Sequence, residues 1–125
     1  MGREIKYKAW LPTIKKMTYG HTLEQWLLDF PHLEDFSEDT VWLQYTGLND
    51  KKGVEIYDGD IIDGSWINPM SQEKVIRQYK VTFNKGKYNA ELIGHHPYGS
   101  TMLYFENENA EVIGNIYENP ELIEV

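Results

Sequence analysis

The sequence predicts a mainly β protein of the α+β class. Short runs in which apolar and polar residues alternate are typical of half-buried strands, and they recur along most of the 125 residues. Turn-forming residues separate these runs about every ten residues, a spacing typical of sandwiches and small barrels. A single segment has the apolar spacing of a helix, so one short helix is expected among many strands.

The first two strands are predicted to form a hairpin. In residues 4–11, Ile5 and Tyr7 alternate with lysines, and this period of two marks a half-buried strand. Pro12-Thr13 breaks the strand, because proline removes a backbone donor and favours a turn. Residues 14–19 then return as the second strand.

The one helix is predicted from Thr22 to Phe30. Thr22 and Gln25 have the spacing of a capping box, in which each side chain accepts a hydrogen bond from the other residue's backbone N–H. Pro31 ends the helix, because the residue before a proline is pushed out of helical geometry. The apolar stripe of this helix consists of Leu23, Trp26, Leu27 and Phe30.

The remaining strands are predicted between residues 41 and 117. Asn49–Gly53, Asp58-Gly59 and Asn68-Pro69 are turn signals, and Asn84–Gly86 is a strong hairpin signal. The predicted strands cover residues 41–46, 54–57, 61–62, 74–83, 87–93, 101–105 and 110–117.

These elements predict one domain over residues 1–125. An N-terminal β-hairpin and short helix occupy residues 1–39, and a small SH3-like β-barrel of short antiparallel strands occupies residues 40–118. An apolar content of 41% with 14% aromatic residues indicates a folded chain with a modest core.

The composition excludes several classes of protein. The chain has no cysteine, which excludes disulfides, thiolate metal sites and cysteine nucleophiles. No apolar run approaches the roughly 18 residues that cross a membrane, and the N-terminus lacks an apolar signal segment. We therefore expect a cytoplasmic protein without a membrane anchor.

The charges lie in blocks of alternating sign. The formal net charge of −8 disfavours general binding to nucleic acid. Residues 1–20 carry +4, residues 21–63 carry −9, residues 64–90 carry +4 and residues 91–125 carry −7. Either the blocks face one another within the fold, which is the simpler interpretation, or they form complementary surfaces in a self-assembly.

Three carboxylates lie close together in the sequence. Asp58, Asp60 and Asp63 offer oxygen ligands of the kind that Ca²⁺ or Mg²⁺ prefers. Their spacing does not match an EF-hand loop. Turn formation by aspartate is the favoured interpretation.

The sequence has no catalytic signature. His95 and His96 precede a proline without any H-E-x-x-H pattern, and no serine has a G-x-S-x-G context. Phosphate-binding glycine loops are also absent from the sequence. No cofactor is expected. A metal-dependent enzyme is a weaker hypothesis than a protein-binding or a nucleic-acid-binding function.

A basic and aromatic segment from Lys74 to Tyr88 resembles the surfaces that grip single-stranded nucleic acid. The favoured alternative is an ordinary amphipathic hairpin with aromatic side chains inward and lysines outward. The candidate nucleic-acid-binding residues are Lys74, Arg77, Tyr79, Lys80, Lys85, Lys87 and Tyr88.

Three parts of the chain share a pattern with a known family. They are Arg3–Trp10 at the start, Trp42–Ile62 in the middle and Val112–Leu122 near the end. In this order they resemble the YopX family of small phage and prophage proteins, with Tyr7 and Lys8 where the family often has Phe and Arg. The resemblance implies a phage-derived, oligomeric, cytoplasmic protein. It supplies no biochemical activity and no catalytic residues.

The leading hypothesis is therefore a phage or prophage accessory protein that acts by protein binding or self-assembly in the host cytoplasm. The expected partners are further copies of the chain or a host or phage protein, with no membrane. A single-stranded nucleic-acid-binding module is the alternative, and a metal-dependent enzyme is the second alternative.

Overall fold

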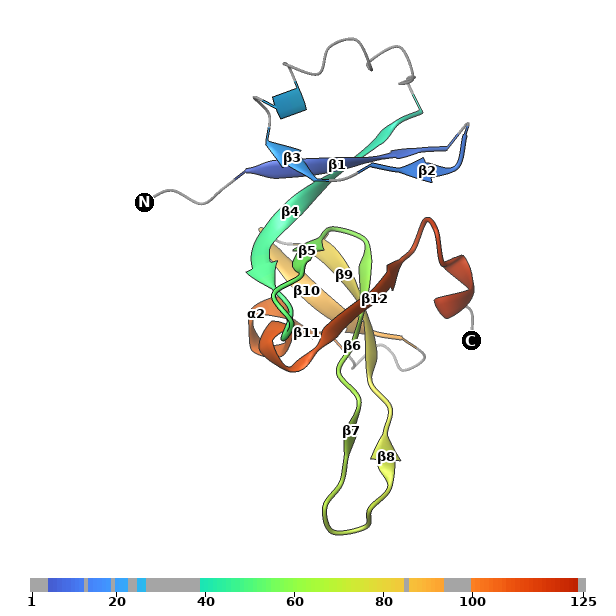
Figure 1. The fold of residues 1–125 in the computed structure, drawn as a ribbon. Helices are drawn as coiled ribbons and strands as arrows, with labels where there is room; N and C mark the ends of the chain where they lie inside the picture. Colours follow the sequence, from blue (N-terminus) through green and yellow to red (C-terminus); the bar gives the residue numbers. More distant parts are fainter. Residues whose placement is uncertain are drawn as a thin grey trace.

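The fold is known from a computed structural model, which describes residues 5–12, 14–18, 20–22, 25–26, 39–84, 86–93 and 100–123. It is mainly β (Figure 1). Among the described residues, the short helical segments are Gln25-Trp26, α2 (Leu103–Glu106), η2 (Asn107–Asn109) and η3 (Pro120–Leu122). Every strand pair among the described residues is antiparallel.

The first sheet gathers the N-terminal strands around β1 and β4. Its order is β2-β1-β4-β5, and β3 also pairs with β1. The strands are β1 (Lys6–Leu11), β2 (Lys16–Met17), β3 (His21–Thr22), β4 (Val41–Asn49) and β5 (Glu55–Tyr57). β1 and β2 pair through Trp10 opposite Met17, on either side of the turn that begins after Leu11.

The second sheet is formed by strands from Asp60 onward in the chain. Its order is β11-β10-β9-β6-β12. The strands are β6 (Asp60–Asp63), β9 (Gln78–Asn84), β10 (Lys87–Leu92), β11 (Ser100–Met102) and β12 (Glu111–Asn115). The hairpin of β9 and β10 turns at Asn84 and Lys87, where the sequence predicts it. Gly86 has a φ of 78° in that turn, a conformation that glycine adopts without strain.

β4 connects the two parts of the fold. Its first residues pair with β1, and its last residues pair with β5 (Figure 1). β5 leads into β6 through the turn Asp58-Gly59, where Gly59 has a φ of 86°. One short turn therefore connects β5, a strand of the first sheet, to β6, a strand of the second sheet.

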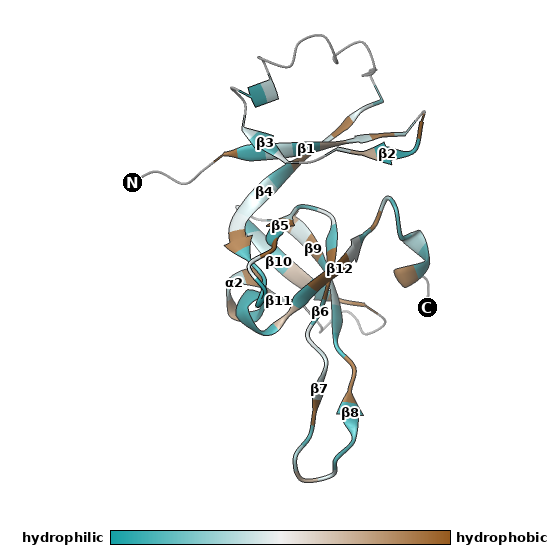
Figure 2. Ribbon diagram, in the orientation of Figure 1, coloured by the Kyte–Doolittle hydropathy of each residue, from teal (hydrophilic) through white to brown (hydrophobic). Residues whose placement is uncertain are grey.

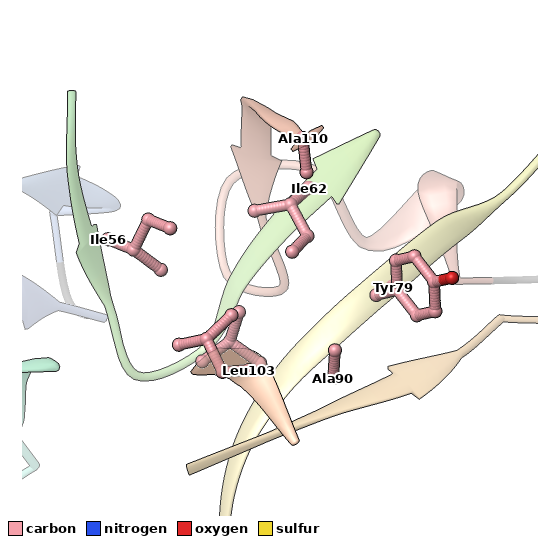
Figure 3. Packing of buried hydrophobic residues seen from close by; sticks show 7 residues of the cluster. Ile56, Ile62, Tyr79, Ala90, Leu103 and Ala110 are labelled. Carbon is pink, nitrogen blue, oxygen red and sulfur yellow. The ribbon is translucent and has the colours of Figure 1, made fainter. Parts of the chain in front are cut away.

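The largest buried cluster lies on one face of the second sheet (Figure 3). Tyr79 and Val81 of β9 point to this face together with Ala90 of β10, because residues two apart on a strand share a face. Ile56 of β5 and Leu103 of α2 cover them. The remaining members are Ile62 and Ala110.

Of the predicted helix Thr22–Phe30, the described residues are Thr22, which is the last residue of β3, and Gln25 and Trp26, which are helical. The N–H of Thr22 donates to Gln25 Oε1 at 2.8 Å, and the N–H of Gln25 donates to Thr22 Oγ1 at 3.2 Å. These are the two hydrogen bonds of a capping box. Trp26 is buried, and its indole N–H donates to the carbonyl of Tyr7 at 2.9 Å.

Two of the strand predictions are wrong in part. The predicted strand 101–105 ends at Met102, and Leu103–Glu106 is helical instead. Residues 102–105 are apolar throughout, so their periodicity does not distinguish a strand from a helix. The predicted strand 74–83 is interrupted after Val75, and it consists of β8 (Lys74–Val75) and β9. The strand β7 (Trp66–Ile67), which pairs with β8, was not predicted.

Candidate interaction surface

A hairpin projects from the second sheet between β6 and β9 (Figure 1). It spans residues 64–77 and is called the arm below. Its two strands, β7 and β8, pair with each other and, in the described part of the chain, with no third strand. Trp66 lies opposite Val75, and Ile67 lies opposite Lys74.

The base of the arm is held to the sheet by hydrogen bonds. The N–H of Gly64 donates to the carbonyl of Arg77 at 2.7 Å, and the N–H of Arg77 donates to Ser65 Oγ at 2.9 Å. Asp63, the last residue of β6, accepts from the N–H of Ser65 at 2.9 Å. The arm therefore leaves the sheet in a defined direction, even though it makes its own small sheet.

The tip of the arm is a turn in which the side chains of Asn68 and Ser71 accept backbone hydrogen bonds. The carboxamide oxygen of Asn68 accepts a hydrogen bond from the N–H of Met70 at 2.9 Å, and the carbonyl of Asn68 accepts from the N–H of Gln72 at 2.7 Å. Gln72 has a φ of 60°, in the left-handed region that tight turns use. These contacts present Met70, which is 94% exposed, at the end of the arm.

Both faces of the arm are apolar. Neighbouring residues on a strand point to opposite faces, so Trp66 and Ile67 of β7 lie on different faces. Val75 lies opposite Trp66 in the strand pair, and Ile76 follows directly after β8. Ile67 and Ile76 are each 66% exposed, and Trp66 is 47% exposed. Figure 2 shows these hydrophobic positions along both strands of the arm. An exposed apolar surface of this kind is typical of an interaction site.

The basic candidates for nucleic-acid binding do not form one surface with the aromatic ones. Lys74 and Arg77 are exposed on the arm, and Lys87 is exposed at the start of β10. Lys80 lies on the outer face of β9, where its ammonium is 3.7 Å from the carboxylate of Glu91. Lys85 lies outside the described residues.

The aromatic candidates pack inward. Tyr79 is 4% exposed and belongs to the core, so its ring offers no face to a nucleobase. Tyr88 is partly buried against the same core, and its ring lies 4.9 Å from that of Phe83 in an edge-to-face contact. The arrangement over β9 and β10 is that of an amphipathic hairpin.

The three aspartates of the metal prediction serve different local structures. Asp60 is buried and accepts from Lys8 and from the N–H of Tyr57, at 3.1 and 2.8 Å. Asp63 accepts from Ser65, and Asp58 is half-buried in the turn before Gly59. Nowhere in the described ranges do three or more His, Asp or Glu side chains form a group that would hold a metal ion.

The environment moves the pKa of each aspartate differently. Burial raises the pKa of Asp60, although the ammonium of Lys8 acts in the opposite direction. Burial also raises the pKa of Asp58. Burial acts to raise the pKa of Asp63 as well, but hydrogen bonds from Ser65 outweigh it, so the pKa is lowered.

Asp60 belongs to a polar cluster between β1, β5 and β6. The ammonium of Lys8 lies 3.1 Å from Asp60 Oδ1 and 4.8 Å from the centre of the Tyr57 ring. Lys6 lies 2.6 Å from Glu55, which also accepts from the Tyr57 hydroxyl at 3.1 Å. Each charge in this cluster has a partner, which is the arrangement of a structural junction between the two sheets.

His95 and His96, which were candidates for the site of a metal-dependent enzyme, lie outside the described residues, so that prediction is untested.

The apolar arm was not predicted from the sequence. Its signal is two pairs of adjacent apolar residues, Trp66-Ile67 and Val75-Ile76, which place apolar side chains on both faces of a short strand pair. That pattern differs from the alternation of a strand with one solvent-exposed face.

Comparison with known proteins gives a family and a fold. The family model described as "YopX protein" matches residues 6–124. The solved structure of protein EF1440 from Enterococcus faecalis has a TM-score of 0.59 at 22% identity, over 96% of this chain and 98% of that one. No curated protein matches. Within the described part of the chain, no helix is both long enough and apolar enough to span a membrane.

Proposed function

We propose that this chain, which belongs to the YopX family, works by binding protein, and first of all by binding further copies of itself. The observation that carries the proposal is the arm, whose two faces expose apolar side chains to solvent. We extend the proposal to a phage-derived accessory protein that acts in the host cytoplasm as a homo-oligomer.

The fold proposed for this role is an N-terminal hairpin and helix joined to an SH3-like barrel. The sheet order β11-β10-β9-β6-β12 supports the barrel, together with the 3-10 turn η2 directly before the last strand. In this arrangement the arm is a long excursion between two neighbouring strands of the barrel. Such connections are common places for binding residues on a rigid framework.

The arm is a two-stranded hairpin. A hairpin without a third strand or a packed face is marginally stable in water. Full burial of one large aliphatic side chain stabilises a contact by about 1.5–3 kcal/mol. A partner that covers Ile67, Met70 and Ile76 would therefore order the arm and gain affinity from the same contact.

The test compares the oligomeric state of the wild-type chain with that of an arm variant, Ile67→Ser with Met70→Ser. We expect the wild type to assemble at micromolar concentration. In the variant, the midpoint concentration of assembly rises at least about tenfold, because two apolar side chains are lost from the contact. Sedimentation velocity over a range of concentrations measures the midpoint.

The matched control is Ile14→Ser, since Ile14 is 55% exposed but lies in the turn between β1 and β2. This variant should assemble like the wild type. A wild-type chain that stays monomeric up to high micromolar concentration would contradict the proposal. An equal effect of the control and arm variants would also contradict it, because the effect would then not depend on the arm.

Binding of single-stranded nucleic acid receives less support from the geometry. Tyr79 is buried and Lys80 lies beside Glu91, so two of the candidate residues are engaged within the fold. That function and metal-dependent catalysis stay predictions from the sequence.

A further inference from the structure

We infer that the arm of one molecule docks on a second apolar surface of another copy, formed by α2 and its neighbours. This inference rests on the proposed self-assembly and adds the acceptor site. The acceptor is called the acidic-aromatic patch below, and it comprises Met102, Tyr104, Phe105, Glu106 and Glu108.

The patch is apolar at its centre. Tyr104 is 69% exposed and Phe105 is 61% exposed, although they directly follow Leu103, which is fully buried. Their ring centres lie 6.0 Å apart in an edge-to-face arrangement, so the two rings form one continuous surface. Met102, at the end of β11, is 37% exposed beside them. Aromatic side chains and methionine are enriched in protein interfaces.

The rim of the patch is acidic. Glu106 and Glu108 follow the aromatic pair directly, and Glu108 is exposed. Residues 91–125 contain no lysine or arginine, so no nearby base in the sequence offsets these carboxylates. Glu111, the next acid, lies 2.9 Å from Lys52 and is engaged within the fold.

The arm has the complementary character. Its apolar side chains lie beside two exposed bases, Lys74 and Arg77, and one exposed acid, Glu73, so the arm carries a net charge of +1. A basic apolar element and an acidic apolar surface match in charge as well as in hydrophobicity, and this complementarity favours one partner over others. The contact between arm and patch would also give a role to the blocks of opposite charge on a chain whose net charge is −8.

The contact joins two copies of the chain. In Figure 1 the arm extends away from the second sheet, on the side opposite the first sheet, and α2 lies beside the second sheet near β11. The tip of the arm therefore points away from the patch of its own molecule. Because arm and patch are different surfaces, the contact is head-to-tail, and it closes into a ring or a reciprocal dimer or continues as a chain.

The test mixes two defective variants. The arm variant is Ile67→Ser with Met70→Ser, and the patch variant is Tyr104→Ser with Phe105→Ser, all at exposed positions. Each variant alone should be monomeric where the wild type assembles. Their mixture should form a 1:1 heterodimer, because the intact arm of the patch variant meets the intact patch of the arm variant.

Sedimentation velocity is measured on each variant, on the mixture and on the Ile14→Ser control, with circular dichroism to establish that each chain is folded. The mixture is followed to roughly a hundredfold above the wild-type midpoint, because a single contact lacks the avidity of a closed ring. A patch variant that assembles like the wild type overturns the inference but leaves self-assembly through the arm standing. A mixture that remains monomeric overturns the head-to-tail contact. A monomeric wild type overturns both proposals.

Discussion

At the residue scale, Asp50 shows how one buried carboxylate joins distant segments. Its Oδ1 accepts from the N–H groups of Lys52 and Val54 at 2.8 and 2.9 Å, and its Oδ2 accepts from the N–H of Val112 at 2.9 Å. The turn after β4 is thereby attached to β12. Burial acts to raise the pKa of Asp50, but these hydrogen bonds outweigh it, and the pKa lies below its usual value.

Replacement of this carboxylate, Asp50→Ala, should lower the free energy of unfolding by about 3 kcal/mol at pH 7, because three N–H donors lose a charged acceptor. A carboxyl group whose pKa is lowered by folding stabilises the fold above its unfolded pKa of roughly 4 and loses this contribution as pH falls. The difference between wild type and variant should therefore shrink toward pH 3. Urea unfolding at both pH values measures it.

The control for Asp50 is Glu121→Ala, since Glu121 is an exposed carboxylate in η3. Its unfolding free energy should change by less than about 0.5 kcal/mol at either pH. An Asp50→Ala cost that is the same at pH 7 and pH 3 would show that the loss does not come from the ionised carboxylate.

At the scale of elements, the two sheets are joined where a side chain of β1 reaches β5 and β6. Lys8 of β1 reaches Asp60 of β6 and lies over the Tyr57 ring of β5. The side chains of Lys8 and Asp60 are 15% and 2% exposed, so this ion pair is largely removed from water. A Cβ at Gly20 would lie 1.7 Å from the Tyr57 hydroxyl, which shows how closely the N-terminal segment approaches this junction.

Loss of the cation, Lys8→Met, should lower the free energy of unfolding by about 3–5 kcal/mol at pH 7, because it leaves the carboxylate of Asp60 buried without its partner. The pKa of Asp60 is already raised by burial, and removal of Lys8 raises it further. Because the protonated form is then favoured in the folded state, the cost should be smaller near pH 4. Urea unfolding at the two pH values checks both statements.

Lys52→Met is the matched control for the ion pair. Lys52 lies 2.9 Å from Glu111, but its side chain is 62% exposed, and an exposed ion pair contributes little to stability because water screens it. If Lys8→Met costs no more than Lys52→Met, the junction does not depend on the buried charge pair.

At the scale of the whole molecule, the fold exposes two apolar surfaces of unlike charge. The arm carries Lys74 and Arg77, and the acidic-aromatic patch carries Glu106 and Glu108. Other charges, such as Lys80 with Glu91 and Lys52 with Glu111, approach each other within the fold. Some opposite charges therefore meet inside the molecule, and a contact between molecules through other charges is part of the proposal.

Assembly of the wild-type chain should weaken as salt increases. Between about 50 and 500 mM NaCl, screening shortens the range of attraction between the basic arm and the acidic patch, and the midpoint concentration should rise roughly three- to tenfold. Sedimentation velocity at each salt concentration measures this change, and urea unfolding of the monomer at the same salts is the control. A midpoint that stays constant or falls would mean that apolar burial alone drives the contact.

Local chemistry alone identified much of the fold. The strand predicted in residues 4–11, the hairpin signal at Asn84–Gly86 and the capping residues Thr22 and Gln25 each involve neighbours within a few positions. The described residues include β1 at Lys6–Leu11, the pairing of Asn84 with Lys87 and both capping hydrogen bonds. The three family-like segments likewise predicted the YopX family that the match over residues 6–124 establishes.

The tertiary structure decided which surfaces are covered and which are open. Alternation marks two faces of a strand but does not tell whether another element packs on either of them. Lys8 and Asp60 are 52 positions apart, so their pairing depends on how the sheets meet. The apolar arm and the exposed Tyr104 and Phe105 are likewise recognised only once the remaining chain has packed elsewhere, because burial is a property of the whole fold.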